Sequence, residues 1–228
     1  MSTILTGVSS MATRVILGDL TGRYEESSGA KVDIKSMGGV DVARLVRAGE
    51  ATDVVVLASG VMGQLEAEGH VLGGSVRGFT SSGMAIVVRA GLPHPDISSE
   101  TAVRRAVEAA RKVGYSTGPS GDHLLKLCAK WGLPADDERL VKAPPGVPVG
   151  SLVARGDADL GFQQLSEFLG VEGVEILGPM PPQIQAVTVF AAGVASTSSQ
   201  PDAARALIDY LASPATAETK RQHGMEPA

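Results

Sequence analysis

The feature that most constrains this chain is the repeated alternation of short β-branched runs with amphipathic segments. Residues 3–8 predict a first strand, and apolar side chains then recur every fourth residue through Ala12, Ile16 and Leu20, as on one face of a helix. The same order of strand and helix follows twice more before residue 70. Such a βαβαβα pattern is most simply satisfied by parallel strands joined through right-handed crossover helices. The sequence therefore predicts an α/β fold.

The same signals extend along the whole chain. Ser9 and Ser10 are expected to cap the first helix, and Gly29 to end it. The stretch 80–83 is small and polar, and 144–149 is a loop rich in proline and glycine. We expect strands over residues 3–8, 31–36, 53–57, 84–88, 112–116, 159–162, 174–177 and 186–191, and helices over 9–29, 38–49, 61–69, 98–111, after Gly121, 149–155, 201–212 and 214–222.

Composition excludes several classes of function. A length of 228 residues permits one large domain or two lobes, each with a real core. The formal net charge of −5 and the 4% aromatic content argue against nucleic acid as a partner. No run approaches the ~18 apolar residues of a membrane span, so we expect no membrane insertion. The single cysteine, Cys128, excludes an intramolecular disulfide framework and a cysteine-rich zinc site.

The N-terminal residues bear on the compartment. Met1 leads almost directly into the short apolar-leaning stretch 4–8, without the basic segment, longer apolar core and small-residue cleavage site of a secretory leader. As written, the chain is expected in the cytoplasm. If a leader precedes the mature chain, a periplasmic location is expected instead.

The residues best suited to bind a ligand stand at three predicted junctions between a strand and a helix. These junctions combine small hydroxyl residues with glycine, and their candidate ligand-binding residues are Ser9 and Ser10; Gly38 and Gly39; and Ser116, Thr117, Gly118 and Ser120. Ser82, in the polar stretch 80–83, and Gln163, just past a strand end, join this set. In open parallel sheets, ligands bind outside the carboxyl ends of the strands, where these junctions lie.

The chemistry of these junctions suits an anion. A helix N-terminus presents free N–H groups and a partial positive charge, hydroxyls add donors, and glycine allows close approach to the backbone. Such a site holds an oxyanion or a carboxylate without lysine or arginine. The alternative is that these residues only cap helices and form turns. The glycine fingerprints of phosphate and dinucleotide loops are absent, and we expect no cofactor and no metal.

Other chemically active side chains give weaker signals. His123 follows the Ser120-Gly121 turn and is a candidate acid, base or donor, against the alternative of an exposed histidine at a helix start. His70, His94 and His223 lack the spacing of metal ligands and are expected to be solvated. Cys128 is in register with the apolar face of its helix and is expected to be a core thiol.

In this order the junctions resemble the type II periplasmic-binding-protein fold, in its molybdate-binding-protein-like branch. The resemblance covers nearly the whole chain. It rests on Ser9-Ser10, residues 44–54, residues 115–121, residues 161–164 and the tail 206–214 with 224–227. It implies two α/β lobes with mainly parallel sheets, joined by two crossovers around a ligand cleft. Mapped here, lobe one would comprise 1–80 and 188–228, and lobe two 81–187.

Two functions are consistent with this resemblance. In the first, the chain binds a small anion, either an oxyanion such as molybdate or an organic di- or tricarboxylate, in the cleft between the lobes; an ABC permease is a partner only if the chain is secreted. In the second, it is a cytoplasmic isomerase or tautomerase of an unsaturated carboxylic acid, similar to aconitate isomerase, which has the same scaffold. His123 would then move the proton. The fold alone does not decide between them.

Overall fold

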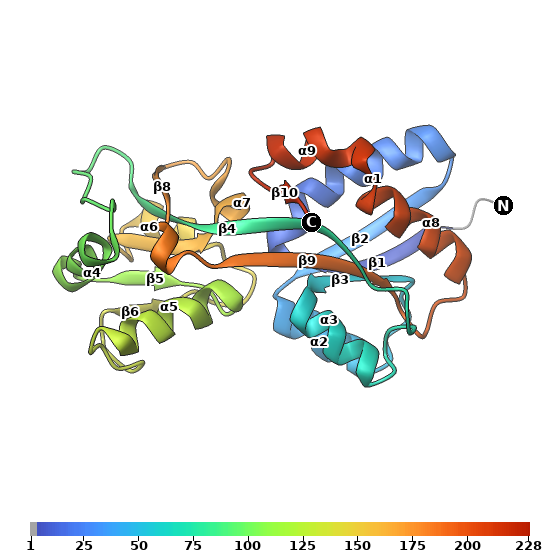
Figure 1. The fold of residues 1–228 in the computed structure, drawn as a ribbon, viewed down its shortest axis with the longest axis horizontal. Helices are drawn as coiled ribbons and strands as arrows, with labels where there is room; N and C mark the ends of the chain where they lie inside the picture. Colours follow the sequence, from blue (N-terminus) through green and yellow to red (C-terminus); the bar gives the residue numbers. More distant parts are fainter. Residues whose placement is uncertain (1–3) are drawn as a thin grey trace. The chain divides into compact units, whose positions relative to one another are not determined.

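A computed structural model describes residues 4–228, and its contacts divide the chain into two compact units. Unit 1 contains the chain up to Ser81 together with Thr188–Ala228, and unit 2 is the inserted segment Ser82–Val187. The chain passes from one unit to the other in β4 (Arg77–Arg89) and at the start of β9 (Val187–Val194), both drawn in Figure 1.

The sheet of unit 1 is built around three parallel strands. β1 (Ile4–Ser10) pairs in parallel with β2 (Lys31–Met37) on one side and with β3 (Val54–Ala58) on the other. β9 adds to β3 in the antiparallel sense, and β10 (Glu226–Pro227) pairs with the first part of β4. The helical elements are η1 (Met11–Thr13), α1 (Arg14–Ser28), α2 (Gly39–Arg47), α3 (Ser59–Ala67), α8 (Pro201–Ala212), η3 (Pro214–Thr216) and α9 (Ala217–Gln222).

Both faces of this sheet are covered, which explains why β3 is a continuous apolar run. Val54 and Val56 point to the face packed against α1 and α8, whereas Val55 and Leu57 pack against α2 and α3. Figure 1 shows α2 and α3 together on one side of unit 1, and α1, α8 and α9 on the other. The alternation of side chains along one strand therefore supplies two separate layers of core.

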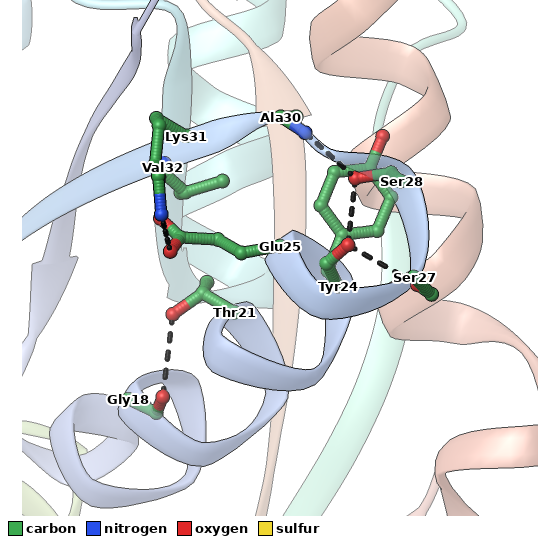
Figure 2. Close-up of polar contacts among 9 residues, drawn as sticks. All are labelled: Gly18, Thr21, Tyr24, Glu25, Ser27, Ser28, Ala30, Lys31 and Val32. Atoms are coloured by element: carbon green, nitrogen blue, oxygen red, sulfur yellow. Dashed lines mark hydrogen bonds and ion pairs between the residues drawn. The ribbon is translucent and has the colours of Figure 1, made fainter.

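The turn between α1 and β2 shows how short-range chemistry sets an element boundary. Gly29 ends α1 with a φ of 72°, a left-handed conformation that glycine adopts at little cost. Figure 2 shows the contacts around it: Ser28 Oγ donates to the Tyr24 carbonyl at 2.6 Å, and the Glu25 carboxylate accepts the backbone N–H of Val32 at 2.7 Å. The end of the helix is thus tied directly to the start of the next strand.

Unit 2 has a second sheet with the same mixture of strand directions. β5 (Val113–Tyr115) pairs in parallel with β6 (Leu140–Lys142) and with β7 (Leu160–Gln164). β7 and β8 (Val174–Pro179) are both antiparallel to the second part of β4. The helical elements are α4 (Glu100–Ala109), α5 (Pro119–Lys130), α6 (Val149–Arg155), α7 (Leu165–Phe168) and η2 (Pro182–Ile184).

Two glycines let α6 lie directly on the sheet of unit 2. A Cβ at Gly161 would come within 2.8 Å of Val153, 2.9 Å of Val87 and 3.0 Å of Val149. A Cβ at Gly114, on the neighbouring strand, would lie 3.0 Å from Val149. The close approach of α6 therefore depends on missing side chains. α4 and α5 cover the opposite face, where the larger core cluster contains Trp131 and Phe162.

The structure confirms most predicted elements and corrects others. α8 spans residues 201–212 as expected, and Ser99 caps α4 by accepting the N–H of Ala102. Ser9 and Ser10 do not cap α1, because they are the last residues of β1 and η1 intervenes. The polar stretch 80–83 lies inside β4 because its backbone pairs with β10 and continues into the core strand. The predicted start of the first strand at Thr3 lies outside the described residues.

Strand β6 and the short helix α7 were not predicted. The expected parallel order of the strands is also interrupted, because β9 pairs with β3 and β4 pairs with β7 in the antiparallel sense. Across residues 4–228, none of the helices has the length and apolar character needed to span a membrane.

The glycine contacts yield a stability prediction. Replacing Gly161 by alanine should lower the free energy of unfolding by about 1–3 kcal/mol, because the new methyl group overlaps three valines in a packed core. Urea unfolding followed by circular dichroism measures the change. The matched control is Gly18→Ala on the exposed face of α1, where nothing lies within 4 Å of the added atom. That variant should gain about 0.5–1 kcal/mol from helix propensity. Equal effects of both substitutions would contradict the packing argument.

Candidate functional site

The carboxyl edge of the parallel strands in unit 1 brings the predicted serines together. Ser9 stands level with Ser36 on β2, and their hydroxyl groups are hydrogen-bonded at 2.7 Å. Ser9 is fully buried, so this pairing satisfies a hydroxyl that would otherwise be costly to bury. Its side chain is thus hydrogen-bonded within the protein itself.

Ser10 differs from its neighbour. Its side chain is 8% exposed, and its Oγ has no hydrogen-bond partner within residues 4–228. Buried polar atoms are nearly always paired, so an exception calls for an explanation. A Cβ at Gly39, the first residue of α2, would lie 3.8 Å from Ser10 Cβ and 3.6 Å from Leu57, so Ser10 adjoins the start of that helix.

Two helices begin at this edge. Gly38 is the N-cap of α2 and Gly39 its first residue, as the sequence predicted, and within the described residues no side chain caps the start of this helix. α3 begins at Ser59, directly after β3, with Ala58 as its N-cap and again no side-chain cap. Sequence reasoning missed Ser59, although a hydroxyl immediately after a buried strand was an available signal. Its Oγ donates to the Val189 carbonyl at 3.0 Å.

Unit 2 has a corresponding edge, where β5 leads into α5. Ser116 Oγ and Ser120 Oγ are hydrogen-bonded at 2.9 Å, and the N–H of Gly118, the N-cap of α5, lies 3.4 Å from Ser116 Oγ. A Cβ at Gly121 would lie 1.9 Å from the Ser116 carbonyl oxygen, so this turn accepts only glycine there. Thr117 is half-buried in the same turn. The structure therefore joins Ser116, Gly118 and Ser120 into one cluster.

Gln163 lies at the same end of this sheet, because Tyr115 is in register with Phe162 on β7. It is 3% exposed. Its Oε1 accepts the backbone N–H of Val149, the first residue of α6, at 2.9 Å, and its Nε2 donates to Glu167 Oε2 at 2.6 Å. Both ends of the amide are thus engaged by neighbouring elements.

Glu167 is the titratable group that sequence reasoning missed. It lies on α7, four residues after Gln163, and burial raises the pKa of its carboxyl to about 8. The residue keeps a partly exposed surface, but the charged form loses most of its hydration without gaining a cation in exchange. Near neutral pH this carboxyl therefore holds a proton. No sequence motif predicts a buried carboxyl at this position, because the burial of Glu167 depends on how α6 and α7 pack.

The remaining candidates fall in different places. Ser82 is buried inside β4, at no helix start, and its Oγ lies a long 3.5 Å from the Gly83 carbonyl. The polar stretch that contains it is thus part of a strand and not a loop, and its role in ligand binding stays a prediction. His123, half-buried on α5, has its Nε2 2.8 Å from the Ile184 carbonyl. Because a carbonyl can only accept, Nε2 carries the hydrogen, and Nδ1 of the neutral ring is the nitrogen able to take a proton.

The other histidines and the cysteine have structural positions. His223 is paired with Asp19 at 3.2 Å and is only 24% exposed at its side chain, so the prediction that it is solvated is wrong. His94 pairs with Glu175 at the surface. Cys128 is fully buried, and burial raises the pKa of its thiol to about 11, so it is the core thiol that was predicted. In the described part of the chain, no group of histidine, cysteine and carboxylate side chains is suited to hold a metal ion.

Comparison with known proteins places this geometry in a family. Residues 5–226 match the family model described as bacterial extracellular solute-binding protein. The chain belongs to this family. It is also 38% identical to an aconitate isomerase from a Pseudomonas species, over 99% of this chain and 88% of that protein.

Solved structures agree on the fold of the family. The periplasmic molybdate-binding protein of Azotobacter vinelandii superposes with a TM-score of 0.80 at 20% identity, covering 97% of this chain and 98% of that one. The sulfate-binding protein SubI of Mycobacterium tuberculosis gives a TM-score of 0.79 at 19% identity, covering 99% and 87%. The predicted resemblance is thus confirmed, and the fold is the two-lobe α/β fold of type II periplasmic binding proteins. At these identities the likeness establishes the fold alone.

The raised pKa of Glu167 yields a prediction on stability. Its pKa in the folded protein lies above the ordinary value of 4.5, so the folded state holds a proton that the unfolded state releases. The free energy of unfolding should therefore fall as pH rises from about 4.5 to about 8, by up to ~1.4 kcal/mol per pH unit from this group. Glu167→Gln should remove this slope, as measured by urea unfolding between pH 5 and pH 8.

The matched control is Glu172→Gln, which changes an exposed carboxylate of the same unit. Its free energy of unfolding should stay within about 0.5 kcal/mol of the wild-type value at every pH. A wild-type slope that persists in Glu167→Gln would show that this carboxyl is ionised throughout the range.

Proposed function

We propose that this chain binds a small anion through hydroxyl groups and backbone N–H groups at the carboxyl edges of its two sheets. The observation that carries this proposal is the buried Oγ of Ser10, which has no partner among the described residues and adjoins the uncapped start of α2. A ligand oxygen at this point would satisfy the hydroxyl. Helix N–H groups would supply the favourable field that the acidic net charge of −5 does not.

Two classes of anion fit such a site, and the relatives of the chain support both. Solved neighbours include molybdate- and sulfate-binding proteins, which favours a tetrahedral oxyanion. The 38% identity to an aconitate isomerase favours an organic tricarboxylate. As a transport receptor, the chain would deliver its ligand to an ABC permease and act outside the cytoplasmic membrane. As an enzyme, it would act in the cytoplasm.

The second candidate function is isomerisation of an unsaturated carboxylate such as aconitate, favoured by that identity over 99% of the chain. The reaction is an allylic proton shift. A base removes a proton from the methylene carbon, the double bond moves by one position, and a proton is returned to the former vinyl carbon. Atoms and electrons balance without a cofactor. His123 is suited to this step, because the Ile184 carbonyl fixes its Nε2–H and leaves Nδ1 to accept the proton.

The binding proposal predicts a specific loss. A panel of molybdate, tungstate, sulfate and di- and tricarboxylates should contain an anion that raises the Tm of the wild type. Ser10→Ala should weaken binding of that anion by about tenfold or more, because a hydrogen bond to a charged group contributes about 1.5–3 kcal/mol. The Tm without ligand should change by no more than about 2 °C, since the hydroxyl has no internal partner to lose.

Ser213→Ala is the matched control, because its Oγ is likewise buried and without a partner in the described chain but lies after α8, away from the strand ends. It should leave affinity unchanged. Equal loss in both variants, or none in Ser10→Ala, would contradict the placement of the ligand. A response to oxyanions alone would contradict the isomerase.

If the chain is an isomerase, incubating it with aconitate in heavy water should incorporate deuterium into the aconitate, which NMR measures. His123→Gln keeps a donor for the Ile184 carbonyl but is not basic, so exchange should fall by about a hundredfold or more. Ser213→Ala should exchange at the wild-type rate. Exchange that is unchanged in His123→Gln would exclude His123 as the base. Absence of both exchange and conversion of aconitate to its isomer in the wild type would exclude the reaction.

A further inference from the structure

We propose that Glu167 is a positioning residue that acts through Gln163, and that the proton it holds keeps the anion-binding edge of unit 2 free of negative charge. Binding of an anion is then coupled to protonation of this carboxyl. The inference rests on the proposed binding function and adds to it a group outside the predicted set of ligand-binding residues.

Two hydrogen bonds fix the orientation of the Gln163 amide. The backbone N–H of Val149 can only donate, so the atom of Gln163 facing it at 2.9 Å is the acceptor Oε1. The amide nitrogen of Gln163 therefore faces Glu167, to which it donates at 2.6 Å. An amide nitrogen carries two hydrogens, so the second is the one that Gln163 would offer to a ligand. Glu167 thus orients the donor that Gln163 presents at the end of β7.

In the part of the chain that the structure describes, no cation lowers the pKa of Glu167. β7 and α6 are the elements in most extensive contact with α7. β7 has no ionisable side chain, and the one on α6, Arg155, lies at the far end of that helix and pairs with Asp157. Phe168 packs within 3.3 Å of the Cβ position of Gly150, which closes α7 against α6. Burial is accordingly what raises the pKa of Glu167, to about 8.

The consequence follows from linkage between the ligand and the proton. An ionised carboxylate behind Gln163 repels an anion at that edge, whereas the protonated carboxyl does not. A bound anion therefore raises the pKa of Glu167 further, and anion binding takes up a proton at pH values above about 8. Affinity should be constant below that pH and fall above it, by up to about tenfold per pH unit.

Calorimetric titration tests this on the full chain, with trans-aconitate and molybdate as probes, both fully ionised over pH 7–9. In the wild type, affinity for the bound probe should fall by up to about fivefold between pH 8 and pH 9, because a carboxyl with a pKa of about 8 is already half ionised at pH 8. Heats measured in two buffers of different ionisation enthalpy should show proton uptake. Glu167→Gln keeps an acceptor oxygen for Gln163 but cannot ionise. It should retain the affinity seen at pH 7 and lose both the fall and the uptake.

Two further variants complete the test. Glu167→Ala removes the oxygen that orients Gln163 and should bind more weakly at every pH, whereas Glu172→Gln should follow the wild-type profile. An equal fall in the wild type and in Glu167→Gln would overturn this inference while leaving the binding function standing. Failure of the wild type to bind either probe at any pH would overturn the binding function and this inference with it.

Discussion

The structure depends on parallel pairing of strands that are followed by helices. β1, β2 and β3 share one carboxyl edge in unit 1, and β5, β6 and β7 share another in unit 2. Parallel pairing brings every following turn to the same edge, so residues far apart in sequence meet there. This parallel pairing explains the contact between Ser9 and Ser36. It also explains why Tyr115 on β5 is in register with Phe162 on β7. A polar edge on an apolar sheet is thus a direct product of the topology.

Sequence periodicity predicted this topology because the relevant signals are local. The apolar run of β3, the glycine that ends α1 and the faces of α2 and α8 can each be read within a short window. β4 could not be predicted at its full length, because Thr80 and Ser81 owe their strand conformation to pairing with residues near the C-terminus. Propensity alone assigns such polar residues to a loop, and a distant partner overrides it.

The candidate site was predicted in its residue types but not in its contacts. The sequence placed Ser9, Ser10, Gly39 and Ser116 at strand ends, and the structure puts them there. It could not show that Ser9 is already paired whereas Ser10 is not, because that difference depends on the register between β1 and β2. Glu167 was missed for a related reason. A glutamate on a four-residue helix is expected to be solvated, and its burial becomes visible only once α7 is packed on the rest of unit 2.

The two units also differ in what chemistry their edges permit. Unit 1 offers hydroxyl and N–H donors, and Asp41, its carboxylate beside the start of α2, is paired with Arg44. Unit 2 adds two side chains able to exchange protons, His123 and Glu167. Binding of a fully ionised oxyanion requires no transfer of a proton to or from the ligand, whereas an allylic shift in a carboxylate cannot proceed without one. The two proposed functions therefore differ chiefly in whether a group such as His123 exchanges a proton with the ligand.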